Sequence, residues 1–299
     1  MKNLDLSGLR MKKQFDYWNF RFSLDDFFYE VTNILLKIVF FFNNILGKNE
    51  FMKKNIELYN IHNNERVFIL GNGPSIKQQN LKLLKDEIVF AVNSGYKHID
   101  YEYIQPKYHV IVDPKLAIGI WDISILDEIL LKNPKVIFLL NSKWYRLDKF
   151  QPYIKDQRFK IYWLNTSLFF TSYYKKREIN LVNITYGGAV LGKSIFSAVY
   201  TGAKNIYLLG VESTGFCSEV LKEETHFYGV NKENKNKDIV VIYKDFYFNY
   251  IYLKNLYHFS QYAKDKNYSV INCSVGGILN MFDRQKYEEV LNSKESLND

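Results

Sequence analysis

Residues 67–75 read Val-Phe-Ile-Leu-Gly-Asn-Gly-Pro-Ser, four apolar residues followed by a turn rich in glycine. Such a run is typical of a buried strand that ends at a turn. Six more short apolar runs have the same character, at residues 88–92, 108–112, 136–140, 160–164, 205–209 and 268–272. Amphipathic stretches that predict helices lie between them, among them residues 81–85, 123–132, 188–201 and 246–264. Continuous apolar strands separated by helices predict a doubly wound α/β fold, with a mostly parallel sheet covered on both faces.

The composition restricts the classes of function. A chain of 299 residues with 47% hydrophobic content can bury one large core plus an appendage. Its formal net charge of +8 favours anionic partners. The 40 Lys and Arg residues are scattered, however, and form neither a zinc finger nor a basic helix, so we expect no nucleic-acid partner. The two cysteines suit neither a disulfide framework nor a zinc site, and the missing pattern of a cleavable signal favours a cytoplasmic location.

Residues 1–62 differ from the α/β domain that we expect at residues 63–299. The apolar stretch at residues 27–46 is interrupted by Lys37 and does not supply the ~20 mostly apolar residues that a spanning helix needs. It predicts an interfacial helix at the inner face of the cell membrane, where the lysines that follow it would contact anionic lipid. These are Lys48, Lys53 and Lys54. The alternatives are that the helix packs on the domain or on a second subunit of a homo-oligomer.

Polar residues follow the first three predicted strands. Asn72 follows the first, Asn93 the second and Asp113 the third. Because the carboxyl ends of parallel strands meet at one edge of a sheet, we expect these side chains to converge on a ligand. Amides suit a nucleobase or ribose hydroxyls, and a carboxylate suits sugar hydroxyls. The alternative is that all three are ordinary turn residues.

The glycine turn is itself a candidate phosphate site. Gly71 and Gly73 let the backbone approach a ligand closely, and Pro74 stiffens the exit from the turn. We expect Ser75 to cap the following helix, whose N–H groups would then face phosphate oxygens. The turn is neither a P-loop nor a complete GxGxxG motif, so a strand-to-helix turn without a ligand is the alternative.

More motifs follow the glycine turn in order along the chain. They are Asn93, Asp113-Pro114, Ile184-Thr185-Tyr186-Gly187-Gly188, residues 202–212, Thr225-His226-Phe227-Tyr228 and residues 272–282. In this order they resemble the motifs of the bacterial lipooligosaccharide sialyltransferases. They are also similar to the domain shared by the motility accessory factor glycosyltransferases and the 6-hydroxymethylpterin diphosphokinase family. The resemblance covers residues 66–284 and leaves the N-terminal segment outside.

The resemblance implies a GT-A-like fold of the Rossmann type and metal-independent glycosyl transfer that requires no cofactor. It implies that the donor is CMP-activated sialic acid or another nonulosonic acid. The acceptor is then a hydroxyl of a cell-surface glycan precursor, such as a lipid-linked unit of lipooligosaccharide, O-antigen or capsule. The resemblance also implies that His226 is the catalytic base and that Ser274 and Gly276 close the nucleotide pocket.

The chemistry of glycosyl transfer suggests further candidates. Glu212 ends a predicted strand and could orient a sugar hydroxyl or assist the base, or could be a turn carboxylate. Tyr228 could donate a hydrogen bond to the leaving phosphate. Thr185 and Gly187 begin a predicted helix whose N–H groups could face the donor's phosphate or carboxylate. Alternatively, the glycine only allows the helix to pack closely on the sheet.

Two departures from the sialyltransferase pattern leave the donor open. Asn183 stands where that family has an arginine, and Glu212-Ser213-Thr214-Gly215-Phe216 stands where it has tyrosines that hold the donor phosphate. One alternative is therefore a Mg²⁺-dependent diphosphokinase of the pterin type, which would use ATP through Asp113 and Glu212. A catalytically inactive, membrane-associated scaffold is the other.

Overall fold

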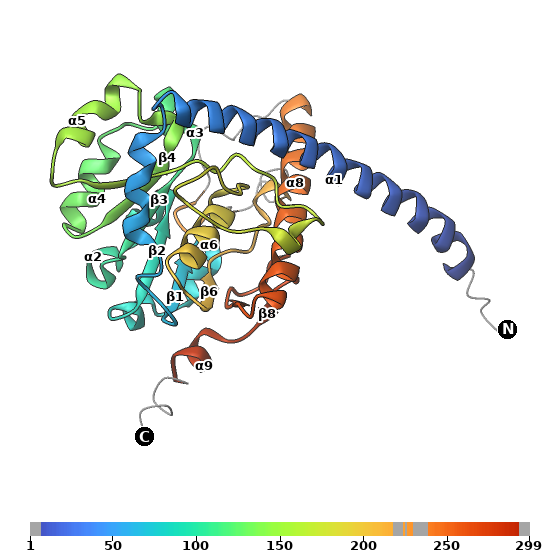
Figure 1. Cartoon of the computed structure of the whole chain (residues 1–299). Coiled ribbons are helices and arrows are strands. Elements are labelled where there is room, and N and C mark those ends of the chain that lie inside the picture. The colour runs from blue at the N-terminus through green and yellow to red at the C-terminus, as the bar shows by residue number, and fades with distance from the viewer. Residues whose placement is uncertain (1–6, 218–223, 225, 230–238, 293–299) are drawn as a thin grey trace.

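The computed structural model describes residues 7–217, 224, 226–229 and 239–292 (Figure 1). Its centre is an eight-stranded sheet in the order β5-β4-β3-β2-β1-β6-β7-β8, and every neighbouring pair is parallel. The strands are β1 (Arg66–Leu70), β2 (Ile88–Val92), β3 (Tyr108–Ile111), β4 (Ile137–Asn141), β5 (Lys160–Leu164), β6 (Asn205–Leu209), β7 (Ser269–Asn272) and β8 (Asp283–Arg284). All seven predicted strands are confirmed. The sequence did not predict β8, because two residues are too few to form an apolar run.

Helices connect the strands. The α-helices are α1 (Ser7–Ile45), α2 (Tyr101–Ile104), α3 (Pro114–Ile118), α4 (Ile125–Lys132), α5 (Gln151–Lys155), α6 (Val190–Tyr200), α8 (Ile239–Asp265) and α9 (Tyr287–Asn292). Among the short 3₁₀ segments are η1 (Glu50–Leu58), η2 (Pro74–Gln78) and η3 (Leu81–Leu84). The helix predicted at residues 81–85 is therefore wrong in type, since η3 is a single tight turn that the Asn80 side chain caps at the N–H of Lys82.

The two faces of the sheet are both covered, which confirms the predicted α/β fold. Val67 and Ile69 of β1 belong to a buried cluster that includes residues of α6 and α8. Phe68 and Leu70, which alternate with them, face the opposite side and pack with η2, η3 and α9. Strands buried on both faces need apolar side chains at every position, which explains why the sequence runs were continuous and not alternating.

The strand order places a switch point beside β1. From β1 the chain winds outward through β2, β3, β4 and β5, and then returns to β6 on the other side of β1. Loops that leave neighbouring strands at such a point diverge, and a crevice opens between them. The glycine turn that follows β1 lies at this crevice.

Helix α1 packs on the domain along one side. Asp26 forms ion pairs with Lys254 at 2.7 Å and with His258 at 3.3 Å, both on α8. The Asn33 amide exchanges two hydrogen bonds with the backbone of Phe169, at 2.9 and 2.8 Å. Figure 1 shows α1 crossing the domain close to α8, with its N-terminal half extending beyond the sheet.

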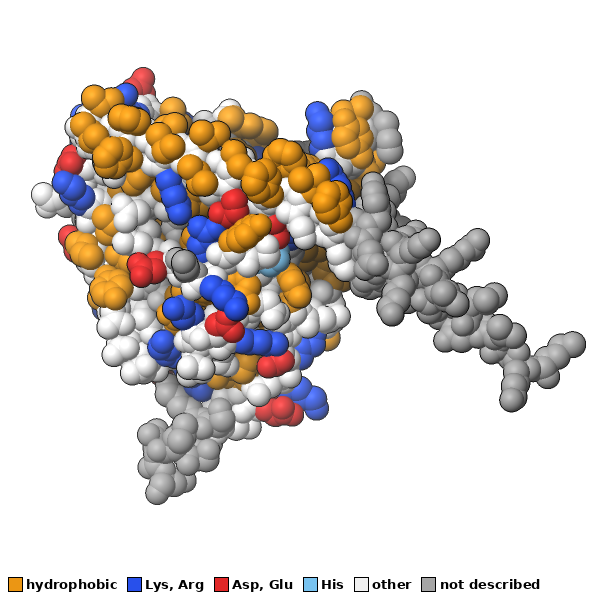
Figure 2. Space-filling view, turned by 45° about the vertical axis from the view of Figure 1, so that its right-hand side comes forward, with side chains coloured by type: hydrophobic (Ala, Val, Ile, Leu, Met, Phe, Trp, Pro, Cys, Tyr) orange, Lys and Arg blue, Asp and Glu red, His pale blue; other side chains and the backbone are white. Residues whose placement is uncertain are grey.

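The opposite side of α1 is apolar and exposed. Figure 2 shows hydrophobic side chains gathered in a band along this helix. The band consists of Phe20, Phe27, Phe28, Val31, Ile34, Leu35, Ile38, Val39, Phe41, Phe42 and Ile45. Within the described residues no single helix passes the length and hydropathy test for a membrane span, although residues Asn19–Ile45 together with η1 pass it as a pair bent by 105°.

The Asp26 contacts predict that the docking of α1 depends on pH. Burial alone would raise the pKa of Asp26, but the contacts with His258 and Lys254 outweigh it and hold the pKa well below its usual range. A carboxylate with a lowered pKa contributes stability above its ordinary pKa of about 3.9, and this contribution is lost as the pH falls toward the lowered value. Asp26→Asn should therefore destabilise the protein at pH 7 and remove part of the loss of stability below about pH 4.

Urea unfolding at pH 7 and pH 3 measures both effects. Asp86→Asn is the matched control, because Asp86 is exposed and has no ion pair among the described residues. Equal pH dependence in Asp26→Asn and the wild type would contradict the expectation.

Candidate functional site

A cavity of about 700 Å³ opens at the switch point. Its volume lies within the range of about 300–1,000 Å³ that is typical of ligand pockets. The cavity is lined by the loops after β1, β2 and β6, the entry to α6, the segment at residues 166–169 and one side of α8. Of the residues proposed from the sequence, it is lined by Gly71, Asn72, Gly73, Pro74, Asn93, Gly187, Glu212 and His226.

The glycine turn is occupied by the protein's own carboxylate. Glu212 Oε1 accepts a hydrogen bond from the N–H of Ser75 at 2.8 Å, and the Glu212 side chain is 7% exposed. A Cβ atom on Gly73 would lie 1.4 Å from Glu212 Oε2, so only glycine leaves room for this carboxylate. The N–H group expected to meet a phosphate therefore meets Glu212. The expected capping by the Ser75 side chain is wrong, because Gly73 is the N-cap and no side chain caps η2.

The loop after β7 holds Glu212 from behind. Ser274 Oγ accepts a hydrogen bond from the N–H of Val211 at 2.8 Å, and the N–H of Ile278 donates to Glu212 O at 2.9 Å. A Cβ atom on Gly277 would lie 2.5 Å from the Glu212 backbone. Neither Ser274 nor Gly276 lines the cavity. This loop thus supports the site from outside, and the glycine that close packing requires is Gly277.

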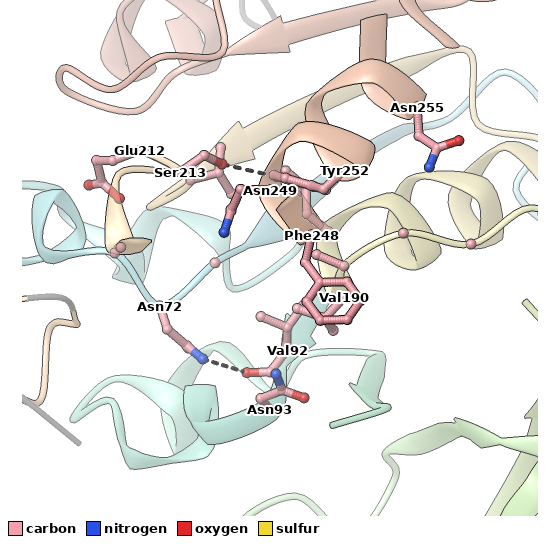
Figure 3. A pocket seen from close by; sticks show the side chains of 18 of the residues that line it. Asn72, Val92, Asn93, Val190, Glu212, Ser213, Phe248, Asn249, Tyr252 and Asn255 are labelled. Carbon is pink, nitrogen blue, oxygen red and sulfur yellow. Dashed lines mark hydrogen bonds between the residues drawn. The ribbon is translucent and has the colours of Figure 1, made fainter. Parts of the chain in front are cut away.

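Two residues of the cavity wall, Asn72 and Asn93, carry buried amide oxygens. Asn72 Nδ2 donates to Val92 O at 3.2 Å (Figure 3), and Asn72 Oδ1 lies near Gly95. Asn72 Oδ1 and Asn93 Oδ1 are both buried and have no hydrogen-bond partner among the residues that the structure describes. Buried polar atoms are normally paired, so these two acceptors indicate a ligand that carries N–H or O–H donors.

A buried histidine fixes the backbone at Asn93. His109 Nε2 lies 2.8 Å from Asn93 O, and His109 Nδ1 lies 2.8 Å from Tyr101 Oη. Burial lowers the pKa of His109 to about 4, so the ring is neutral and its Nε2–H donates to the carbonyl. Asn93 is held in a left-handed conformation at φ 43°, which sets the direction of its side chain. His109 is therefore a core residue whose two ring nitrogens are both paired.

The N-terminus of α6 faces the cavity. Gly188, Ala189 and Val190 line it, and the N-cap residue Ala189 has no side chain that could accept from the first-turn N–H groups. Uncapped N–H groups and the helix dipole together favour an anion at this position. The helix begins at Val190, later than the sequence predicted. Thr185 consequently lies upstream of the helix, paired with the segment at residues 165–168, where it is buried and outside the cavity lining.

Helix α8 forms a wall that the sequence did not reveal. Phe248, Asn249 and Tyr252 line the cavity from this helix, and Figure 3 shows Phe248 beside Val190. Tyr252 Oη lies 3.0 Å from Ser213 Oγ, and burial raises the pKa of Tyr252 to about 12. The phenol therefore stays protonated and can donate a hydrogen bond into the cavity. The sequence predicted this helix, but no local pattern indicated which of its sides would line the cavity.

His226 lies at the cavity and is tied to the glycine turn. The N–H of Phe227 donates to Asn72 O at 2.9 Å, so the backbone next to His226 is anchored on the loop after β1. The His226 ring packs against Tyr228, with the ring centroids 4.9 Å apart. Tyr228 itself does not line the cavity. His226, the proposed base, therefore lies at the cavity. Tyr228, proposed to donate a hydrogen bond to the leaving phosphate, lies outside the cavity lining.

The structure does not bring Asp113 to this cavity. Strand β3 lies two places away from β1, and Asp113 Oδ1 caps the short helix α3 by accepting from the N–H of Lys115 at 3.0 Å. The expected convergence therefore holds for Asn72 and Asn93 only. No group of three or more His, Cys, Asp and Glu side chains that could hold a metal ion occurs in the described part of the chain.

Comparisons with known proteins identify a family and similar solved structures. A family model described as 6-hydroxymethylpterin diphosphokinase MptE-like matches residues 43–218, more than half of the chain. The solved structures include the MAf glycosyltransferase from Magnetospirillum magneticum AMB-1, which is 13% identical with a TM-score of 0.45. That match covers 83% of this chain and 41% of the MAf glycosyltransferase, so this chain corresponds to about two fifths of that protein. No curated protein matches the chain.

The contact between Gly73 and Glu212 gives a direct test of the site. Gly73→Ala should displace the Glu212 carboxylate and leave the N–H of Ser75 buried without an acceptor, which costs about 1–3 kcal/mol. Gly215→Ala is the matched control, because Gly215 also lines the cavity but an added Cβ would meet nothing within 4 Å. Chemical denaturation measures both variants, and an equal effect of the two substitutions would refute the steric argument.

Proposed function

Because the chain belongs to the 6-hydroxymethylpterin diphosphokinase MptE-like family, we propose a function that fits both this family and its cavity: transfer of a sugar from a nucleotide-activated donor. One observation carries the proposal. An uncapped helix N-terminus, a histidine and two asparagines all border one cavity at the switch point of the sheet, and the asparagine amide oxygens have no partner in the described part of the chain. These groups match the phosphate, the nucleoside and the reacting hydroxyl of a glycosyl transfer.

The donor that fits best is a CMP-activated nonulosonic acid such as sialic acid. A helix N-terminus carries roughly half a unit of positive charge, which suits the single phosphodiester of such a donor. Asn72 Oδ1 and Asn93 Oδ1 can accept hydrogen bonds from the cytosine amino group or from ribose hydroxyls. The remaining polar lining of hydroxyls and amides suits the sugar.

In the proposed reaction His226 removes the proton from the acceptor hydroxyl as its oxygen attacks the anomeric carbon. The bond between that carbon and the phosphate oxygen breaks, and CMP leaves with the bonding electrons. The α6 N-terminus stabilises the charge that develops on the phosphate. We assign the hydrogen bond to the leaving phosphate to the Tyr252 hydroxyl in place of Tyr228, because Tyr252 lines the cavity beside Gly188.

The alternative diphosphokinase reaction has less support from the geometry. Its Mg²⁺ would be held by Asp113 and Glu212, but Asp113 accepts a hydrogen bond from the N–H of Lys115 and Glu212 accepts one from the N–H of Ser75. They do not face one cavity, so they do not form a pair of metal ligands. An inactive scaffold would preserve the fold without preserving buried acceptors that lack partners.

We also propose that the protein lies at the inner surface of the cell membrane through α1, where it would meet a lipid-linked acceptor. The apolar band of α1 is exposed although the other side of the helix is docked (Figure 2). Lys48 and Lys53 follow the band and are exposed. Apolar side chains beside lysines favour adsorption to anionic lipid.

A thermal-shift screen of CMP, CDP, UDP, GDP and ATP, each with and without Mg²⁺, tests the donor. We expect CMP to stabilise the protein by ~2.7 kcal/mol at about 100 times its Kd, without a need for Mg²⁺. Stabilisation by ATP and Mg²⁺ alone would favour the diphosphokinase, and stabilisation by none of the nucleotides would favour the scaffold.

His226→Ala tests the base. The variant should keep its affinity for CMP and lose transfer by about 10²- to 10⁴-fold, because general base catalysis contributes that much. Tyr228→Phe is the control that retains the neighbouring ring, and it should transfer at nearly the wild-type rate. Unchanged turnover in His226→Ala would remove His226 from the mechanism.

Vesicle binding tests the membrane contact. The double substitution Phe41→Asp and Phe42→Asp, at residues 60% and 57% exposed, should abolish cosedimentation with vesicles rich in anionic lipid. Leu131→Asp is the matched control, since Leu131 is 84% exposed but lies on α4. Equal cosedimentation of the two variants would refute a role for α1.

A further inference from the structure

A second cavity, of about 750 Å³, lies between α1 and the carboxyl ends of β4 and β5. It adjoins the first cavity, because Thr166, Ser167 and Phe169 line both. None of the catalytic and donor-binding residues proposed from the sequence lines it. A molecule in the second cavity could therefore extend one end past residues 166–169 toward the proposed donor.

Four cationic side chains line this cavity. Lys193, on the first turn of α6, and Lys143, on the loop after β4, both line it, and so do Arg146 and Lys48. Burial and the nearby charge of Lys143 lower the pKa of Lys193 to about 8, although Asp113 partly offsets them. No described residue forms a hydrogen bond or an ion pair with the Lys193 ammonium group. Neighbouring ammonium groups that no carboxylate of the described chain contacts directly are stabilised when an anion binds beside them.

The other side of the cavity is apolar. Leu36, Val39 and Phe40 of α1 line it, together with Phe51 and Phe169. The three α1 residues have helical spacing and form one stripe along the helix. Val39 is also 57% exposed and belongs to the apolar band on the outer side of α1. The apolar wall of the cavity is thus continuous with the surface that we propose to contact lipid.

We infer that the second cavity binds the phosphate end of a lipid-linked acceptor, with the phosphate between Lys143 and Lys193 and the first part of its chain along α1. The inference rests on the proposed transferase function, and it names the class of acceptor. A phosphate at these lysines would place an attached sugar near residues 166–169, where the two cavities meet. The lipid chain could then reach the membrane along α1. Phosphate contacts made by lysines and apolar contacts made by α1 would together distinguish this acceptor from a free sugar.

Calorimetric titration of the full chain with farnesyl diphosphate, inorganic diphosphate and farnesol tests the inference without any need for turnover. We expect farnesyl diphosphate to bind more tightly than either of the other two, because each of them keeps only half of the contacts. Lys193→Met and Lys143→Glu should each weaken the binding of farnesyl diphosphate by about tenfold or more, through loss of a charge-assisted contact. Lys143 is exposed, so Lys143→Glu reports on binding even if the buried substitution impairs folding.

Lys82→Gln is the matched control, because Lys82 is an exposed lysine on η3 that lines neither cavity. It should leave the affinity for farnesyl diphosphate unchanged. An unchanged affinity in Lys143→Glu, competition between CMP and farnesyl diphosphate, or equal affinity for inorganic and farnesyl diphosphate would each overturn the inference. If CMP fails to bind while farnesyl diphosphate binding still depends on the two lysines, the proposed donor is wrong and the phosphate site remains.

Discussion

The hydrogen bond from the N–H of Ser75 to the Glu212 carboxylate is the contact on which the site depends. It joins the loop after β1 to the loop after β6, the two strands between which the sheet reverses its order. Gly73 leaves the space for the carboxylate, and the loop after β7 holds the Glu212 backbone from behind. Because a negative charge already occupies the glycine turn, a donor phosphate would be repelled there. The N-terminus of α6, across the cavity, is the position that remains for it.

The two cavities differ in the chemistry of their linings. The first is lined by amides, hydroxyls and a helix N-terminus, which suit an uncharged nucleoside and one phosphate. The second has lysines on one side and the apolar stripe of α1 on the other. Helix α1 connects both functions, because its docked side contacts the loop at residues 166–169 and its outer side is the exposed apolar band. The segment that lies outside the sheet is therefore part of the proposed acceptor site.

The sequence predicted the elements better than it predicted the contacts between them. Seven strands were predictable because strands buried on both faces are continuously apolar, and Asn72 and Asn93 were predictable because they end adjacent strands. The prediction that Asp113 joins Asn72 and Asn93 was wrong, because the order of the strands cannot be read from the sequence and β3 lies away from the switch point. The partner of Ser75 lies 137 residues further along the chain, so no local pattern shows it. The α8 wall and Lys193 were missed for the same reason, since each depends on how a helix packs on the sheet.

A crystal structure of the complex with CMP would test the central claim most directly. We expect the phosphate oxygens to lie about 3 Å from the N–H groups of the first turn of α6, with Glu212 still bound to the N–H of Ser75. We also expect Asn72 Oδ1 or Asn93 Oδ1 to accept a hydrogen bond from the nucleoside. A phosphate bound at the glycine turn in place of the Glu212 carboxylate would contradict the account.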